Sequence, residues 1–181
     1  MRIACVVRVV VALAWAVPAA AQTDMAAQGA RLLLPFKQEL QQALQHALTQ
    51  GPEQAVEVCS QQAPRLAARF SGNGIEMGRS SHLLRNPANA PQAWLAPVLA
   101  RYAQTVHHAA PTVHLLGDGR QAYVEPIYIK PLCLLCHGQS PPATVARAIA
   151  RRYPDDRAVG FQPGQFRGVF WVVFPAAADP S

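Results

Sequence analysis

The sequence contains no apolar run long enough to cross a bilayer, which takes about 20 residues in a helix. Its longest apolar stretch, Val6 to Val17, is interrupted by Arg8 and ends in the small residues Ala19-Ala20-Ala21. This pattern is typical of a secretory signal peptide, residues 1–21, cleaved after Ala21. We therefore expect an exported, periplasmic protein without stable membrane insertion, in which residues 22–181 form a single domain.

The sequence also lacks any block of basic residues, although its formal net charge is +6. Cleavage of the signal peptide would remove two arginines and no acid, and would leave a charge of +4. In an exported protein, this modest excess argues against nucleic acid as a partner. The excess either helps docking to an acidic protein or belongs to an ordinary solvated surface. Because we find no kinase, methyl-accepting or membrane-spanning segment, we expect any redox or signalling partner to be a separate protein.

Cysteine is scarce, and two of the four cysteines fall in the segment Cys133-Leu134-Leu135-Cys136-His137. A Cys-X-X-Cys-His segment is typical of covalent haem c attachment. Its two thiols can bond to the two vinyl groups along one edge of the porphyrin, and the short link places the histidine under the iron. The sequence therefore predicts one covalent haem c, with Cys133 and Cys136 as anchors and His137 as the proximal ligand.

Two other uses of these thiols remain open. In an oxidising compartment Cys133 and Cys136 could form a disulfide, and with Cys59 and His137 they could bind zinc. The histidine directly after the second cysteine favours haem c.

Methionine is scarce as well, and none of the three follows Cys133. Ordinary small cytochromes c have an early attachment site and a methionine ligand well downstream, so this chain does not match them. The helical-bundle cytochromes c′ place the site late, on their last helix. Pro131 before the site and Pro141-Pro142 after it prevent a long helix there.

Hydrophobic periodicity predicts an α+β domain, an antiparallel sheet flanked by N-terminal helices. Apolar residues recur at helical spacing in four segments: 25–50, 53–70, 94 to about 107, and 144–152. Segments rich in β-branched and aromatic residues predict four strands: 75–80, 112–116, 121–129 and 167–174. A Gly117-Asp118-Gly119 turn joins the second and third strands into a hairpin. Trp171, Phe170 and Phe174 are expected to fill the core around the haem.

A set of short motifs occurs in a fixed order between residues 55 and 175. They are Arg79-Ser80-Ser81, Arg85-Asn86-Pro87, the attachment site with Gly138, Tyr153-Pro154 with Asp156, Ala158-Val159-Gly160-Phe161, and Gly164 with Arg167-Gly168. Together they resemble a family of single-haem c-type domains with a PAS-like fold. Members occur alone in the periplasm or thylakoid lumen, and as sensor parts of histidine kinases and chemoreceptors. Ser80 stands where that family has threonine.

The sixth ligand of the iron separates the possible functions. Two strong protein ligands favour electron transfer, whereas an open or labile position admits a small gas or peroxide. Cys59 is the favoured candidate, because it is the one cysteine of the mature chain that the two haem thioethers do not use. The resemblance also implies an axial thiolate in the N-terminal helical region. The alternative is a small core residue on a helix. The weaker candidates are Met25, Met77, His46, His82, His107, His108 and His114.

Arg79 and Arg85 are candidate partners of the haem propionates, because guanidinium pairs bidentately with carboxylate and stays charged when partly desolvated. Alternatively, they brace the Asn86–Pro91 loop through carbonyl contacts.

The expected function is electron transfer or redox sensing by one haem c. The alternative is a module that senses nitric oxide or carbon monoxide and signals to a separate protein. We expect no catalytic residue and no enzymatic activity, because no peroxidase-like distal histidine and arginine pair can be assigned.

Overall fold

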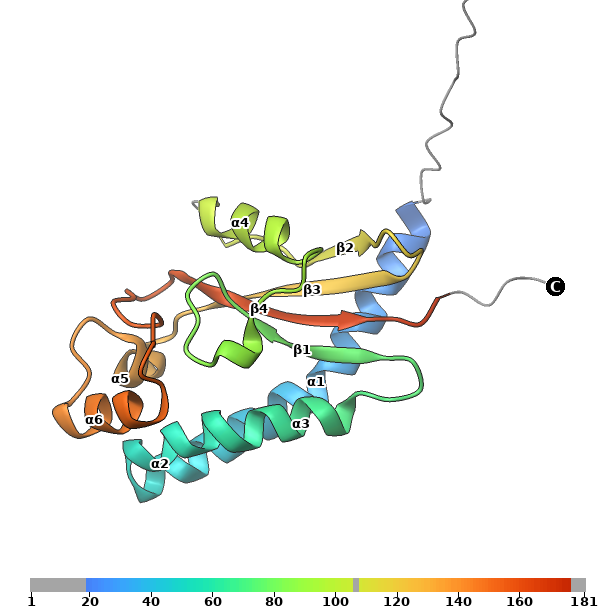
Figure 1. The fold of residues 1–181 in the computed structure, drawn as a ribbon. Helices are drawn as coiled ribbons and strands as arrows, with labels where there is room; N and C mark the ends of the chain where they lie inside the picture. The colour runs from blue at the N-terminus through green and yellow to red at the C-terminus, as the bar shows by residue number, and fades with distance from the viewer. Residues whose placement is uncertain (1–18, 106–107, 177–181) are drawn as a thin grey trace, which may run out of the picture.

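A four-stranded antiparallel sheet forms the centre of the fold (Figure 1). The computed structural model describes residues 19–105 and 108–176, so most of the predicted signal peptide lies outside the described residues. The strands are β1 (Glu76–Ser80), β2 (Thr112–Leu115), β3 (Gln121–Tyr128) and β4 (Phe166–Val173), in the order β1-β4-β3-β2. The sheet with its helices confirms the α+β class.

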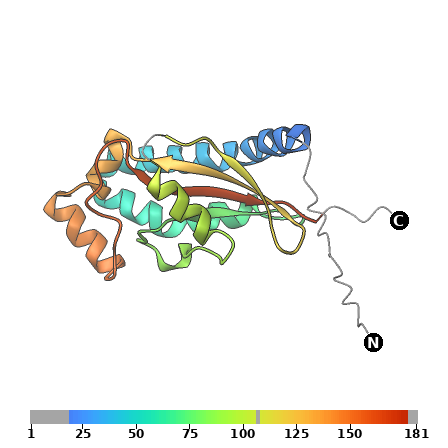
Figure 2. The ribbon, with the colours of Figure 1, turned by 90° about the horizontal axis from the view of Figure 1, so that it is seen from above.

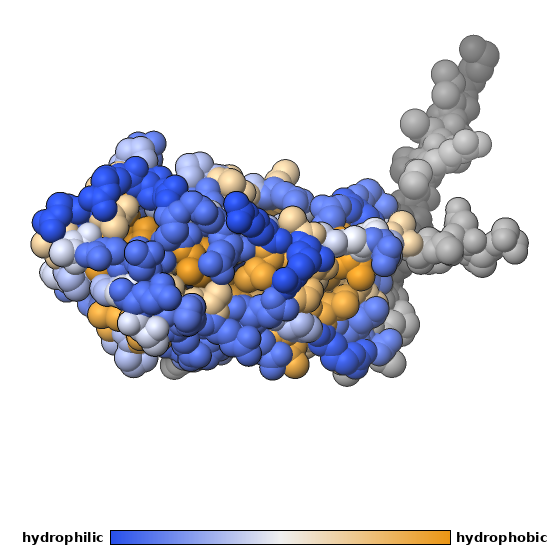
Figure 3. Space-filling view, turned by 90° about the horizontal axis from the view of Figure 1, so that it is seen from below, coloured by the Kyte–Doolittle hydropathy of each residue, from blue (hydrophilic) through white to orange (hydrophobic). Residues whose placement is uncertain are grey.

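Helices cover both faces of the sheet. α1 (Ala19–Gln50), α2 (Pro52–Glu57) and α3 (Ala63–Phe70) lie on one face, and α4 (Ala96–Gln104) lies on the other (Figure 1). The outer surface on the α1–α3 side is mainly hydrophilic, with hydrophobic residues visible between the polar ones (Figure 3). Among the described residues, none of the helices combines the length and apolarity needed to cross a membrane.

Two short helices, α5 (Leu134–His137) and α6 (Ala143–Arg152), lie together at one end of the molecule (Figure 2). The beginning of α1 and the end of β4 lie at the opposite end. The predicted haem attachment segment, residues 133–137, therefore lies just after β3 leaves the sheet. The 3-10 turn η3 (Pro131–Cys133) connects the two.

The predicted apolar face of α1 supplies the larger core. Leu33 and Phe36 are fully buried against Met77 of β1, Tyr123 of β3 and Val172 of β4. Burying a side chain of this size stabilises the fold by about 2 kcal/mol. This packing holds α1 firmly on the sheet.

A second core lies on the opposite face of the sheet, where Leu95, Leu99 and Tyr102 pack against Val124 and Val169. β4 is buried on both faces, as its continuous apolar content predicts.

The segment predicted as one helix over 53–70 is interrupted by a π-helical turn, η1 (Val58–Gln62), which contains Cys59. A π-turn adds one residue to the hydrogen-bonded ring, and such turns often occur at functional sites. Hydrophobic periodicity does not reveal it, because the apolar positions remain close to helical spacing on both sides.

A β-bulge interrupts the pairing of β3 with β4. Ile127 pairs with Gly168 and Tyr128 with Phe166, so Arg167 is the extra residue. Gly168 has a φ of +154°, and a Cβ there would collide with the carbonyl oxygen of Ser80. Glycine is therefore required beside the bulge.

Candidate functional site

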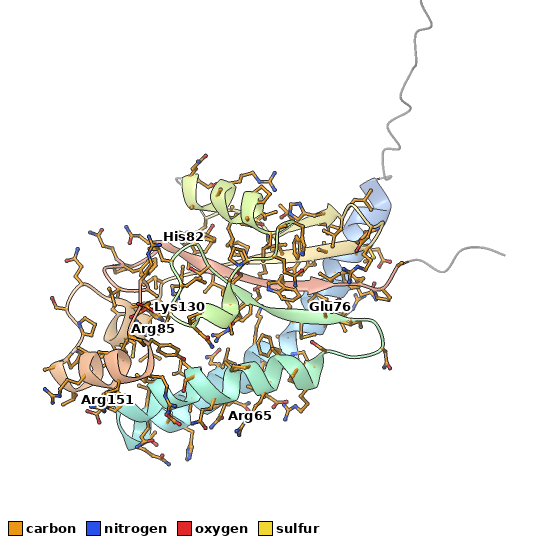
Figure 4. The ribbon with its side chains drawn as sticks, in the orientation of Figure 1. Arg65, Glu76, His82, Arg85, Lys130 and Arg151 are labelled. Atoms are coloured by element: carbon orange, nitrogen blue, oxygen red, sulfur yellow. The ribbon has the colours of Figure 1, made fainter. Side chains whose placement is uncertain are left out.

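A cavity of about 230 Å³ lies between the N-terminal helices, the end of the sheet and α5. Its walls are largely apolar, with Leu48 from α1, Val56 from α2, and Ile127 and Phe170 from the sheet. Arg85 lies in this region, between the sheet and the α5–α6 pair (Figure 4). The cavity thus combines a hydrophobic interior with a few charged groups, as cofactor sites commonly do.

Cys133, Cys136 and His137 all line this cavity. Pro131 starts η3, where its missing N–H is harmless, and the helical segment ends at Gly138. The three cysteines that the structure describes are free, so the possible Cys133–Cys136 disulfide is not formed. Within the described ranges, no three His, Cys, Asp or Glu side chains are grouped so that they could hold a metal ion.

The His137 ring is fixed by a backbone carbonyl. Its Nδ1 lies 2.7 Å from the carbonyl oxygen of Ala158. A carbonyl oxygen only accepts, so Nδ1 carries the hydrogen and Nε2 keeps its lone pair. Burial, followed by the charges of Arg167 and Arg85, lowers the pKa of His137 to about 3. The imidazole is therefore neutral at ordinary pH, as a metal ligand must be.

Two backbone hydrogen bonds close the attachment segment onto the loop that follows α6. Phe161 N donates to His137 O at 2.9 Å, and Gly160 N donates to Gly138 O at 3.0 Å. The position of the imidazole thus depends on this loop as well as on α5.

Arg85 braces the attachment segment. Its Nη2 donates to Cys136 O at 2.6 Å, to Asp156 Oδ2 at 3.0 Å and to Ala158 O at 3.1 Å. The side chains of Arg85 and Asp156 are only 9% and 7% exposed. A buried charge needs such partners, because its hydration is lost.

Arg85 does not brace the Asn86–Pro91 loop, which was the alternative, because none of its three hydrogen-bond acceptors belongs to that loop. Ser80 contacts that loop instead, its Oγ donating to Asn89 O at 2.8 Å. Arg85 does line the cavity, and its Nε is buried without a partner among the described residues. A propionate contact through Arg85 stays a prediction.

Two further arginines line the cavity. The side chain of Arg79, on β1, makes no hydrogen bond or ion pair with the part of the chain that the structure describes, although its backbone pairs with β4. Arg167, at the bulge, donates from Nη1 to Ser81 Oγ at 2.7 Å and to Leu83 O at 3.2 Å. Burial, and the nearby charges of Arg85 and Arg79, lower the pKa of Arg167 to about 10.

Cys59 lines the same cavity from η1 and is half-buried. Tyr153 lies beside it, and its pKa is raised by burial and by the proximity of Cys59. Cys59 therefore faces the space that the attachment segment also faces.

The other candidate ligands point elsewhere. Met77 is buried in the core with Leu33, and Met25 packs against the same cluster. His46 contacts Gln50, His82 stacks on Phe166, His108 stacks on Tyr128, and His114 contacts Thr112. His107 falls outside the described residues. Of the candidates within the described ranges, Cys59 alone lines the cavity.

Three aromatic residues in or just after β4 divide between the two faces of the sheet. Phe170 lines the cavity, whereas Trp171 packs edge-on against Trp94 and Phe174 joins the core under α1. Of these three predicted residues, Phe170 alone is placed to contact a bound group in the cavity.

Sequence reasoning missed the Ala158 carbonyl, the brace by Asp156 and the inward position of Arg167. The signal that could have indicated these positions is the spacing of short motifs, in which Asp156, Ala158 and Arg167 all occur. The donor set as a whole fits haem c: two thiols, a neutral imidazole, a third thiol and guanidinium groups for carboxylates around one apolar cavity.

Comparison with known proteins agrees with this geometry. The crystal structure of the cyanobacterial heme-protein Tll0287 is similar, with 27% sequence identity and a TM-score of 0.59 over 81% of this chain and 94% of that one. None of the curated protein sequences compared with the chain matches it significantly. The family model described as Tll0287-like matches residues 19–175. The chain therefore belongs to the Tll0287-like family.

Proposed function

We propose that this chain is a periplasmic c-type haem protein that transfers or senses electrons, without enzymatic activity. One observation carries the proposal: a single apolar cavity is lined by Cys133, Cys136, a neutral His137 and the free thiol of Cys59. The similarity to a cyanobacterial heme-protein supports haem as the bound group.

In this proposal, the two thiols of the attachment segment anchor the porphyrin. Each thiol would add across one vinyl group, with its sulfur bonding to one carbon and its hydrogen going to the other. Burial raises the pKa of Cys136, so this thiol is protonated at neutral pH. Both cysteines line the cavity from the short η3–α5 segment.

His137 and Cys59 would hold the haem iron. His137 would bind through Nε2, because Ala158 O already holds Nδ1. Cys59 would bind as a thiolate from η1. Bound haem would supply a one-electron Fe(III)/Fe(II) couple, and two protein ligands favour electron transfer over binding of external ligands. A thiolate stabilises Fe(III), so we expect a low reduction potential.

The attachment is tested by the mass and colour of the protein purified from the periplasm of a host that matures c-type cytochromes. The intact mass should exceed that of residues 22–181 by one haem, and the colour should stay with the polypeptide in acidic organic solvent. Cys133→Ala with Cys136→Ala should lose the covalent haem. A colourless wild-type protein would overturn the proposal.

The choice between electron transfer and gas sensing is tested by absorption spectra of the oxidised, reduced and carbon monoxide-treated protein. No change on adding the gas supports electron transfer, whereas ready ligand exchange supports the sensor alternative. Cys59→Ser should change the oxidised spectrum, and the neighbouring Ser60→Ala should leave it unchanged. An unchanged spectrum in Cys59→Ser would remove Cys59 as an iron ligand.

A further inference from the structure

The β-bulge in β4 directs a third arginine toward the cavity. In regular pairing, neighbouring residues of a strand point to opposite faces of the sheet. Phe170 lines the cavity, so Arg167, three positions earlier, would point to the other face in an uninterrupted strand. The extra residue shifts that alternation, and Arg167 lines the cavity as well. Bulges commonly re-aim a side chain beside a functional site.

The charge of Arg167 has no carboxylate partner in the described structure. Its two hydrogen bonds go to a hydroxyl and a carbonyl, Ser81 Oγ and Leu83 O. Arg79, which lines the same cavity, also lacks a carboxylate partner among the described residues. No aspartate or glutamate lines the cavity in the described ranges, and Asp156 is paired with Arg85.

This arrangement leaves two positive groups at an apolar cavity, next to the braced Arg85. Placing unpaired cations together in such surroundings is unfavourable unless an anion neutralises them. Guanidinium groups match carboxylates particularly well, because two parallel N–H donors meet the two oxygens. The cavity is therefore suited to a bound group that carries two carboxylates.

We propose that Arg79 and Arg167, rather than Arg85, bind the two propionates of the haem and thereby raise its reduction potential. This inference rests on the proposed haem c. With both guanidiniums in place, their positive charges favour the reduced iron, which carries one positive charge fewer. They would thus offset part of the preference for Fe(III) that a Cys59 thiolate imposes.

The test is a redox titration of the purified holoprotein and its variants. In Arg167→Met and in Arg79→Met, the ratio of reduced to oxidised protein at a fixed potential should fall about tenfold, which is about 59 mV for one electron. Arg167→Lys keeps the positive charge, so its reduction potential should stay close to that of the wild-type protein. Arg65→Met is the matched control, because Arg65 is exposed on the outer side of α3 (Figure 4).

The pH dependence provides a second readout that a purely structural role would not change. Beside a guanidinium a propionate stays ionised, so the wild-type potential should be nearly constant from about pH 8 to about pH 5. Without the guanidinium, protonation of the propionate becomes easier. The potential of Arg167→Met should then rise as the pH falls over this range.

Arg79→Met keeps the inference testable if Arg167→Met folds poorly, because the Arg79 side chain makes no hydrogen bond with the described residues, and its backbone pairing in β1 does not depend on the side chain. A coloured wild-type protein, with potentials and pH profiles of both methionine variants equal to those of Arg65→Met, would overturn this inference alone. A colourless wild-type protein would overturn the proposed function and this inference with it.

Discussion

At the scale of single residues, the carbonyl oxygen of Ala158 connects the two groups that define the site. It accepts hydrogen bonds from His137 Nδ1 and from Arg85 Nη2. Asp156, two residues earlier, holds the same guanidinium and also accepts from Ala158 N at 2.9 Å. The ligand, the brace and the loop therefore form one hydrogen-bonded unit.

The buried Arg85–Asp156 pair makes a prediction about stability. Asp156→Asn removes the carboxylate charge and leaves the Arg85 guanidinium buried without a counter-ion. Breaking such a pair costs about 3 to 5 kcal/mol. We expect a loss of this size in the free energy of unfolding, measured by urea titration of the holoprotein.

The adjacent Asp155 provides the control, because it carries the same charge and is exposed. Asp155→Asn should change the free energy of unfolding by less than about 0.5 kcal/mol. Equal effects of the two substitutions would show that the Arg85–Asp156 pair contributes little.

His114 predicts a dependence of stability on pH. Burial, and then the charge of Arg101, lower its pKa in the folded protein from the ordinary 6.5. The unfolded chain therefore binds the proton more tightly, so the free energy of unfolding should fall as the pH drops below about 6.5 and be unaffected above it. His114→Gln should reduce this loss, as measured by urea unfolding at several pH values.

The exposed His46 on α1 serves as the matched substitution for this experiment. If His46→Gln reduced the acid sensitivity as much as His114→Gln, the assignment to the half-buried His114 would be wrong.

At the scale of secondary-structure elements, two local irregularities bring side chains to the site. The π-turn η1 contains Cys59, and the bulge in β4 contains Arg167. Both irregularities add one residue to an otherwise regular element. The regular parts of the same elements build the two cores. The extra residues therefore set the positions of Cys59 and Arg167 without changing how the cores pack.

The bulge leads to a prediction at Gly168. Gly168→Ala forces a side chain into a positive-φ conformation and against the carbonyl oxygen of Ser80. We expect a loss of about 1 to 3 kcal/mol in the free energy of unfolding. Gly117→Ala has open space around the new methyl group and should be close to neutral. A neutral Gly168→Ala would show that the bulge tolerates a side chain.

The sequence predicted the regular elements well, because hydrophobic periodicity reflects local geometry. The hairpin of β2 and β3 and the buried strand β4 were expected within a residue or two of their observed bounds. The irregular turns were not, since one extra residue hardly disturbs an apolar pattern. The partners of Arg85 were also missed, because they lie 51 to 73 residues away in the chain and depend on tertiary packing.

At the scale of the whole molecule, exposed basic residues gather around the end that carries the site. α6 has three arginines and no acidic residue, and Lys130 and Arg157 are exposed beside it. Lys130 and Arg151 lie at this end, whereas Glu76 lies toward the opposite one (Figure 4). Glu57 pairs with Arg152 and Asp155 is also exposed near α6, so the basic excess at this end is partly offset, and the remainder favours the approach of anions.

This asymmetry predicts the salt dependence of electron exchange. An anionic inorganic reductant should reduce the haem faster than a cationic one of similar potential, and added salt should diminish the difference. Substituting Arg147 and Arg151 by glutamine should slow the anionic reagent roughly twofold to fivefold in stopped-flow measurements. The same change at Arg65 and Arg69, on α3, should have little effect. Equal rates with both reagents would contradict a field-directed approach.

Two backbone hydrogen bonds between the attachment segment and residues 160–161 close the chain around α6. Phe161 N donates to His137 O and Gly160 N donates to Gly138 O, so these two bonds connect the chain just before α6 to the chain just after it. Residues 139–159 thus leave and return at nearly the same point. We therefore expect that the exposed residues of the 139–159 segment can be replaced or extended, to suit a different docking protein, without moving the His137 imidazole.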